Sequence, residues 1–180
     1  MTDFEPENDA TGDPAAGWEV MDHTADIGLR VWAPTLEGLF EQAAEGVASL
    51  SVDITRIDPL VQRRVEVEGW DLEELLVSWL QEFLYLWSGS GFIGRRFQVR
   101  ILPPSKQEPG EQDPEKADVE KAGVENVWRL EGVITGEMWD PGRHEAYTDI
   151  KAATYHNLKI RSENPAGGKI IYRVALILDT

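Results

Sequence analysis

One predicted helix dominates the sequence: DLEELLVSWLQEFLYLWSGSG, residues 71–91. Its large apolar side chains recur three and four positions apart, which is the spacing of an amphipathic helix. Asp71 and the two glutamates after Leu72 form a capping box that starts the helix, and the glycines and serines at 88–91 end it. The wide apolar stripe consists of Leu72, Leu75, Leu76, Trp79, Leu80, Phe83, Leu84 and Trp87.

The sequence around this helix predicts strands and a second helix. Leu60 to Glu68 alternates between valines and charged residues, as a strand does when one face is buried. Thr35 is the expected N-cap of a helix whose apolar residues continue through Leu50. Further strands are expected at 17–21, 27–33, 92–102, 127–139, 150–160 and 169–178. Two helices and about seven strands predict an α+β fold, with the two main helices packed on one side of a mainly antiparallel, or mixed, sheet.

Two segments differ in composition from the rest. Residues 1–16 are acidic and contain Gly and Pro, and we interpret them as a disordered tail. Residues 103–125 combine prolines with Glu, Asp, Lys and Gln and have almost no apolar content, so we interpret them as a disordered insertion. Because strands are expected on both sides of this insertion, residues 17–180 are predicted to form a single domain.

The composition limits the class of protein. The chain has 180 residues, no cysteine and a formal net charge of −16. Disulfides and thiolate metal sites are therefore excluded, and a broad nucleic-acid-binding surface is not expected. We see neither a signal peptide nor a run of apolar residues long enough to span a membrane, so we expect a soluble, cytoplasmic protein. The excess of 11 arginines over six lysines in an acidic chain suits a high-salt cytoplasm.

Polar residues with the chemistry of a site gather at the ends of three predicted strands. The sequence DHTADIG, residues 22–28, places Asp26 directly before a strand. The turn-forming residues between the last two predicted strands suggest a hairpin, and a register with Ile160 opposite Ile170 puts Lys151 opposite Asp179. If the first and last long strands are antiparallel, Asp26, Lys151 and Asp179 lie at the same end of the sheet, with the terminal carboxylate of Thr180.

These oxygen ligands select a hard cation such as Ca²⁺, Mg²⁺ or Mn²⁺. Zn²⁺ would fit if His23 or His156 joined the site, but the histidines do not have a standard zinc spacing. The sequence contains no phosphate-binding glycine-rich loop, nucleophile elbow or dinucleotide fingerprint, so a self-sufficient nucleotide-using enzyme is not indicated.

Each candidate also has a purely structural interpretation. Asp26 would serve equally well as a turn cap, and Asp179 as a solvated chain end. Lys151 would serve as an edge-strand lysine that discourages aggregation. The pair Tyr155-His156 within an apolar segment is more typical of a hydrogen-bonded core pair than of two ligands.

Several segments in order resemble the archease family. They are Asp22 to Gly28, Thr35 to Ala44, Leu75 to Leu80, Asp149 to His156, and the ending Leu178-Asp179-Thr180. The resemblance runs from about Gly17 to the last residue, and it depends on separate motifs in the same order.

The resemblance implies a protein cofactor for an RtcB-type RNA ligase in tRNA splicing and RNA repair. Archeases promote guanylylation of the ligase's active-site histidine and allow repeated turnover, so RNA and GTP are expected to be reached only through the ligase. The family's metal site corresponds to Asp26, Asp179 and Thr180, and calcium is the metal we expect first. Its important lysine corresponds to Lys151, and His156 of the same motif is a further candidate functional residue. His23 and Asp149 remain unassigned between site and structure.

Two departures from the family pattern are visible. The 103–125 segment is longer than expected, and the last residue is Thr where an apolar residue is expected. Two alternatives to the activator hypothesis also stay open at this point. One is a stand-alone metal-dependent phosphoester hydrolase that uses a metal-bound water. The other is a general chaperone or scaffolding module that works through exposed apolar surface.

Overall fold

The computed structural model describes residues 16–21, 27–104, 126–155, 158–164 and 168–180. In these residues the strands and helices follow one another in an order that mixes the two types. The elements are β1 (Gly17–Met21), β2 (Ile27–Ala33), α1 (Leu36–Ser51), the short 3₁₀ helix η1 (Ile54–Arg56), β3 (Val61–Gly69), α2 (Leu72–Ser90), β4 (Phe92–Leu102), β5 (Trp128–Met138), β6 (Ala152–Thr154), β7 (Arg161–Glu163) and β8 (Ile171–Asp179).

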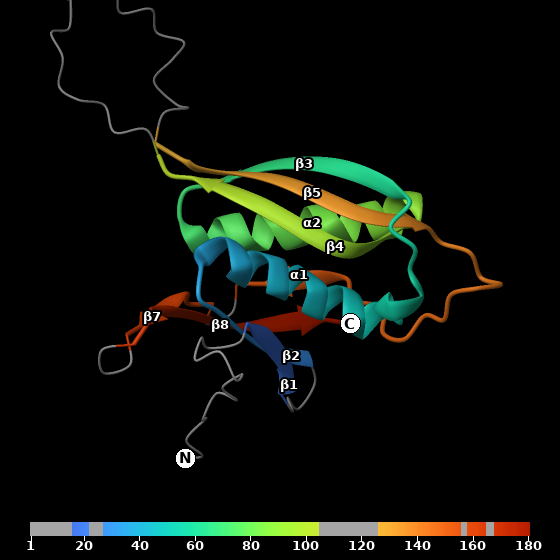
Figure 1. Ribbon diagram of the computed structural model, residues 1–180, viewed down its shortest axis with the longest axis horizontal. Helices are drawn as coiled ribbons and strands as arrows, with labels where there is room; N and C mark the ends of the chain where they lie inside the picture. Colours follow the sequence, from blue (N-terminus) through green and yellow to red (C-terminus); the bar gives the residue numbers. More distant parts are fainter. Residues whose placement is uncertain (1–15, 22–26, 105–125, 156–157, 165–167) are drawn as a thin grey trace, which may run out of the picture.

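The strands form two antiparallel sheets. In the five-stranded sheet the order is β1-β2-β8-β6, and β7 also pairs with β8. In the three-stranded sheet the order is β3-β5-β4. Figure 1 shows the two helices between these sheets, so the described part of the chain has three layers.

The predicted α+β class with two main helices is confirmed, but the strands are divided between two sheets and the helices are covered on both sides. The breadth of the apolar stripe on α2 explains this difference. Leu75, Leu76, Trp79 and Leu80 are all fully buried, and they belong to a cluster that includes residues of both sheets. A single sheet covers only one face of a helix, whereas so wide a stripe needs a partner on each side.

Trp79 is the largest fully buried side chain. Its indole N–H donates to the carbonyl of Phe40 over 3.2 Å, which links the two helices. Its ring packs against Gly132 of β5, where an added Cβ would overlap the indole. Gly132 therefore permits the close approach of helix and sheet that this core requires.

The helix ends agree with the sequence prediction. The hydroxyl of Thr35 accepts from the backbone N–H of Gly38 over 3.0 Å, and the carboxylate of Asp71 accepts from the N–H of Glu74 over 2.8 Å. Gly91 ends α2 with a positive φ of 68°, and its N–H donates to the carbonyl of Trp87. Gly91 is the glycine at this end that adopts the left-handed conformation.

The predicted continuous strand over 150–160 is wrong. Among the described residues of this range only β6 is a strand, and a second short strand, β7, follows directly after the range; both pair with β8. Ala152 lies opposite Asp179, whereas Arg161 lies opposite Arg173, so the register shifts by three residues between the two strands. The expected pairing of Ile160 with Ile170 therefore does not form. Between the two strands the N–H of Leu158 donates to the carbonyl of Tyr155 over 3.2 Å.

Most of the predicted tail, 1–16, and of the predicted insertion, 103–125, lies outside the described residues. No helix in the described part of the chain is long and apolar enough to cross a membrane.

Candidate functional site

The end of the five-stranded sheet brings together three of the predicted site residues. β2 and β8 are antiparallel, and Ile27 at the start of β2 lies opposite Leu178 near the end of β8. The N–H of Lys151 donates to the backbone carbonyl of Asp179 over 2.9 Å, and Thr180 follows directly. Lys151, Asp179 and Thr180 are all exposed, and we call this group the rim.

The sequence-based register for Lys151 is off by one residue. Lys151 was expected opposite Asp179, and the structure pairs Ala152 with Asp179 instead. The backbone hydrogen bond from Lys151 nevertheless keeps the two residues adjacent. The antiparallel arrangement of the first and last long strands, from which the rim was inferred, is confirmed.

The rim is incomplete within the described residues, because Asp26, His156 and His23 lie outside them. The carboxylate of Asp179, which is described, is a hard oxygen ligand and fits a cation such as Ca²⁺. No group of three or more His, Asp or Glu side chains that would hold a metal exists among the described residues. A complete site at the rim therefore requires at least one of the ligands outside the described ranges.

The connection that leads from β5 to the rim is held against the end of α1. The N–H groups of Tyr147 and Thr148 donate to the carbonyls of Ser51 and Leu50, over 2.8 Å and 3.1 Å. These carbonyls belong to the last turn of the helix, where they have no partner within the helix. Ile150, the residue directly before Lys151, is only 3% exposed and anchors the chain in the core. The backbone of Lys151 is thus fixed on both sides.

A polar cluster with two buried members at the start of this connection was missed by the sequence analysis. We call it the Glu137 cluster, and it consists of Glu137, Arg143, His144 and Asp58. Glu137 is 5% exposed, and its carboxylate accepts from the N–H of Asp58 over 2.6 Å and from the guanidinium of Arg143 over 2.9 Å. A second guanidinium nitrogen of Arg143 donates to the carboxylate of Asp58 over 2.8 Å.

Both ring nitrogens of His144 are used in this cluster. The N–H of Asp140 donates to Nδ1 of His144 over 3.0 Å, so Nδ1 carries no proton. Nε2 therefore carries the proton of the neutral ring and donates it to Glu137, 3.1 Å away. Burial raises the pKa of Glu137, but the hydrogen bonds from Asp58, His144 and Arg143, together with the charge of Arg143, lower the pKa below its usual value.

A sequence signal for this cluster did exist. Glu137 lies in an otherwise uncharged run near the end of the strand predicted at 127–139, and Arg143 and His144 follow within seven residues. An ionisable residue in a buried strand needs a partner, and the nearby basic residues are the obvious candidates.

Tyr155 does not form the core pair that the sequence suggested, because it is 56% exposed. Partial burial and the carboxylates of Glu74 and Asp71 raise the pKa of Tyr155, and a hydrogen bond with Ser78 opposes this. Its phenol therefore stays neutral at physiological pH, beside the first turns of α2. The other half of the proposed pair, His156, lies outside the described residues.

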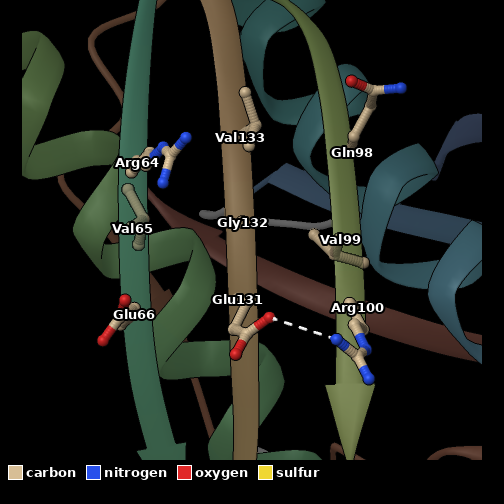
Figure 2. Close-up of a pocket in the computed structure, with 9 residues that line it drawn as sticks. All are labelled: Arg64, Val65, Glu66, Gln98, Val99, Arg100, Glu131, Gly132 and Val133. Carbon is tan, nitrogen blue, oxygen red and sulfur yellow. Dashed lines mark ion pairs between the residues drawn. The ribbon is translucent and has the colours of Figure 1, made fainter.

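The outer face of the three-stranded sheet is shallow and electrically balanced. Figure 2 shows two arginines and two glutamates there, with an ion pair of 3.8 Å between Arg100 and Glu131. Arg64, Glu66 and Gln98 line the same depression, whose volume is about 490 Å³. Neither Lys151 nor Asp179 contributes to it, so this face is separate from the rim.

Comparisons with known proteins match nearly the whole chain to one family. The model of the Archease protein family matches residues 18–180. The chain belongs to the archease family. It is 37% identical over 147 residues to the protein archease of Methanopyrus kandleri, covering 82% of this chain and 91% of that protein. It is 38% identical over 143 residues to that of Pyrococcus furiosus, covering 79% and 87%.

A solved structure supports the fold of this archease. The solution structure of Methanobacterium thermoautotrophicum protein 1598 superposes with a TM-score of 0.67 at 28% identity, covering 91% of this chain and 99% of that one. The family resemblance expected from the sequence motifs is therefore confirmed over the domain.

Proposed function

We propose that this archease activates an RtcB-type RNA ligase in tRNA splicing and RNA repair, and that the rim is the part that contacts the ligase. Family membership supports the proposal, because the sequence resemblance implies this activity for archeases. The RNA-joining chemistry then belongs to the ligase. The archease is a non-catalytic partner in the cytoplasm and reaches RNA and GTP through the ligase.

One structural observation carries the proposal. The hydrogen bond between the N–H of Lys151 and the carbonyl of Asp179 holds the backbones of two exposed, oppositely charged residues side by side at one end of a sheet. A rigid sheet end is a suitable support for a site that must fit a partner. In the proposed complex, Lys151 contacts a phosphate of the GTP or a carboxylate of the ligase. His156 belongs to the same family motif, and we assign it a supporting role at the rim.

Asp26, Asp179 and Thr180 are the residues that would hold a divalent cation. We propose Ca²⁺ first, since Mg²⁺ and Mn²⁺ fit the same oxygen donors with stricter geometry. When bound, the cation would neutralise the mutual repulsion of these carboxylates. The carboxylates themselves are expected to orient the last residues of β8 toward the ligase and to exchange metal ions with its active site.

The test is a ligation assay with RNA halves that end in a 2′,3′-cyclic phosphate and a 5′-hydroxyl, with the ligase present in substoichiometric amount. We expect the archease to allow many turnovers for each ligase molecule. Lys151→Gln and Asp179→Asn should each reduce this stimulation by at least about tenfold, the order expected when a charged contact worth about 1.4 kcal/mol is lost. Each variant keeps the backbone hydrogen bond between the two residues.

Matched controls remove the same charges elsewhere. Lys169→Gln and Glu131→Gln alter exposed residues away from the rim, and both should stimulate like the parent protein. Full stimulation by folded Lys151→Gln and Asp179→Asn variants would contradict the proposal. Turnover of the cyclic phosphate by the archease alone would support a hydrolase instead. Equal stimulation by all variants, with less ligase aggregation, would support a chaperone.

Calorimetric titration tests the cation separately. We expect Ca²⁺ to bind the parent protein with measurable affinity and to bind Asp179→Asn at least about tenfold more weakly, because one of few charged ligands is removed. If the two proteins bind Ca²⁺ with the same affinity, Asp179 is not a metal ligand, and the interpretation of the ligation assay is unchanged.

A further inference from the structure

Four basic side chains line one groove on the outer face of the five-stranded sheet. The groove has a volume of about 270 Å³, and its charged residues are Arg30, Lys159, Arg161, Glu163 and Arg173. They come from β2, from the segment before β7, from β7 itself and from β8. We call it the basic groove. In a chain with 33 acidic and only 17 basic residues, a groove with four cations and one carboxylate on its walls is unusual.

The pairing of strands makes this concentration of charge costly. Arg161 of β7 lies directly opposite Arg173 of β8. Like charges in directly opposed positions of antiparallel strands destabilise the pair. Arg30, paired with Ala175, occupies the next position along the same face of β8. Arg30 pairs with Glu19 and Arg173 pairs with Glu163, and an anion bound in the groove would offset the charge that remains at Arg161.

The present partners of these cations are exchangeable. Arg173 pairs with Glu163 over 3.0 Å, and the carboxylate is 55% exposed. Lys159 pairs with Glu73 over 3.2 Å, and its own side chain is 70% exposed. In each of these two pairs one side chain is more than half exposed and the other is 18% exposed, so water screens the pair in part and a phosphate can compete with the carboxylate. No carboxylate in the described part of the chain lies within ion-pair distance of Arg161.

The basic groove and the rim lie in line on one strand. Every second side chain of a strand points to the same face. On β8, one face therefore carries Arg173, Ala175, Ile177 and Asp179. Four residues separate Ala175 from Asp179, which corresponds to about 14 Å at about 3.4 Å per residue. A ligand that extends from the basic groove along this face therefore reaches the rim.

We propose that the basic groove binds the phosphates of a single-stranded RNA end, and that it guides this end along β8 toward the rim. This inference rests on the proposed function, which brings the rim to a ligase that acts on RNA ends. An extended phosphodiester chain matches the linear arrangement of groove and rim. A long duplex does not match it, because most of the chain's surface is acidic and repels an extended polyanion. This contact is direct and local, and it adds to the ligase-mediated access to RNA that the proposed function assigns.

The test is a titration of the full-length ¹⁵N-labelled archease, without ligase, followed by NMR signals of the backbone and of the arginine Nε–H groups. The probe is a ten-nucleotide oligouridylate with a 3′-phosphate, and inorganic phosphate and GTP are titrated in parallel. We expect saturable shifts at Arg161, Arg173 and Arg30, with the oligouridylate binding at least about tenfold more tightly than inorganic phosphate, because several phosphates are neutralised together.

Arg161→Gln is the decisive variant, and Arg64→Gln on the opposite sheet is its matched control. Both remove one exposed arginine from a strand, and Arg161→Gln also removes the repulsion with Arg173, so it should fold. We expect Arg161→Gln to weaken oligouridylate binding at least about fivefold and to reduce the slope of log affinity against log salt by about 0.7, the value for one contact to single-stranded nucleic acid. Arg64→Gln should bind within about twofold of the parent protein, since its side chain lies on another face.

Three results would overturn the inference. They are the absence of saturable shifts in the basic groove, equal effects of the two arginine variants, and equal affinities for inorganic phosphate, GTP and the oligouridylate. The assay contains no ligase, so its failure leaves the ligation result at Lys151 and Asp179 unaffected. Conversely, the oligouridylate could bind the groove while the Lys151→Gln and Asp179→Asn variants still stimulate the ligase normally. That pair of results would support the basic groove and refute the proposed role of the rim.

Discussion

Replacing the buried Glu137 with glutamine should destabilise the chain strongly, although the two side chains have nearly the same shape. The Glu137 carboxylate accepts hydrogen bonds from the N–H of Asp58, from Arg143 and from Nε2 of His144. A glutamine oxygen still accepts from Asp58 and His144, but as a neutral group. Its amide N–H₂ would face the guanidinium of Arg143, which is also a donor.

The size of the effect follows from these contacts. A hydrogen bond to a charged acceptor contributes roughly 1.5–3 kcal/mol, against roughly 0.5–1.5 kcal/mol for a neutral one. Replacing a charged acceptor by a neutral group in three hydrogen bonds therefore costs about 3 kcal/mol in total. Arg143, whose side chain is 46% exposed, can turn partly into solvent and recover some of this loss. We therefore expect the free energy of unfolding to fall by about 2–3 kcal/mol at pH 7.

Urea unfolding followed by tryptophan fluorescence measures this change, and urea avoids the screening of charge that guanidinium would introduce. The pKa of Glu137 lies below its usual value of 4.5, so its stabilisation is fully present above that pH and is lost as the pH falls through the folded-state pKa. The difference between the parent protein and Glu137→Gln should therefore be constant above about pH 5 and shrink below about pH 4.5.

Glu131→Gln is the matched control, because it makes the same chemical change on β5 at a side chain that is 54% exposed. We expect it to change the free energy of unfolding by less than about 0.5 kcal/mol. The reasoning would be refuted if the two variants were equally stable at pH 7. It would also fail if the deficit of Glu137→Gln persisted unchanged well below pH 4.5, where the carboxylate of the unfolded parent chain takes up a proton.

Three further changes test other parts of the structure by the same urea assay. Gly136→Ala should cost about 3 kcal/mol or more, because its Cβ would overlap a backbone carbonyl of β4, whereas Gly89→Ala on open helix surface should be neutral or stabilising. Asp71→Ala should cost about 1 kcal/mol through the lost N-cap of α2. Glu41→Gln should stabilise by about 0.2–0.5 kcal/mol at pH 7, since desolvation, more than repulsion from Glu37, raises the pKa of Glu41, and the gain should vanish at low pH once Glu41 is protonated.

Local signals predicted the elements of the fold better than their assembly. The helices at 36–51 and 72–90, with N-caps Thr35 and Asp71, follow from apolar spacing and short-range hydrogen bonds. The division of the strands into two sheets depends on which strands pair, and strand pairing is a long-range property that periodicity does not encode. The prediction of a continuous strand over 150–160 was wrong for a related reason. β6 and β7 each pair with β8, but the register of β7 differs from that of β6.

The candidate site was predictable where it depends on antiparallel pairing. A hairpin-like register near the end of the chain placed Lys151 near Asp179, and the hydrogen bond from the Lys151 N–H keeps the two backbones adjacent although the pairing is off by one residue. The Glu137 cluster was not predicted, because Asp58 lies 79 residues before Glu137 and the two meet only after β5 pairs with β3. The basic groove was also missed, since Arg30 of β2 meets Arg161 and Arg173 only through the pairing of β2 and β7 with β8.

The rim depends on both sheets, although it lies at the end of only one. Lys151 ends a connection that begins at the Glu137 cluster beside the three-stranded sheet, passes the last turn of α1 and reaches Asp179 in the five-stranded sheet. A small number of hydrogen bonds holds this connection. Segments held in this way open locally at a lower free energy than the whole domain needs to unfold. A loosened Glu137 cluster should therefore impair ligase stimulation at urea concentrations where the tryptophan signal still reports a folded core. For this reason, a loss of stimulation in any variant of residues 137–150 must be compared with its local protection from hydrogen exchange before it is assigned to contact with the ligase.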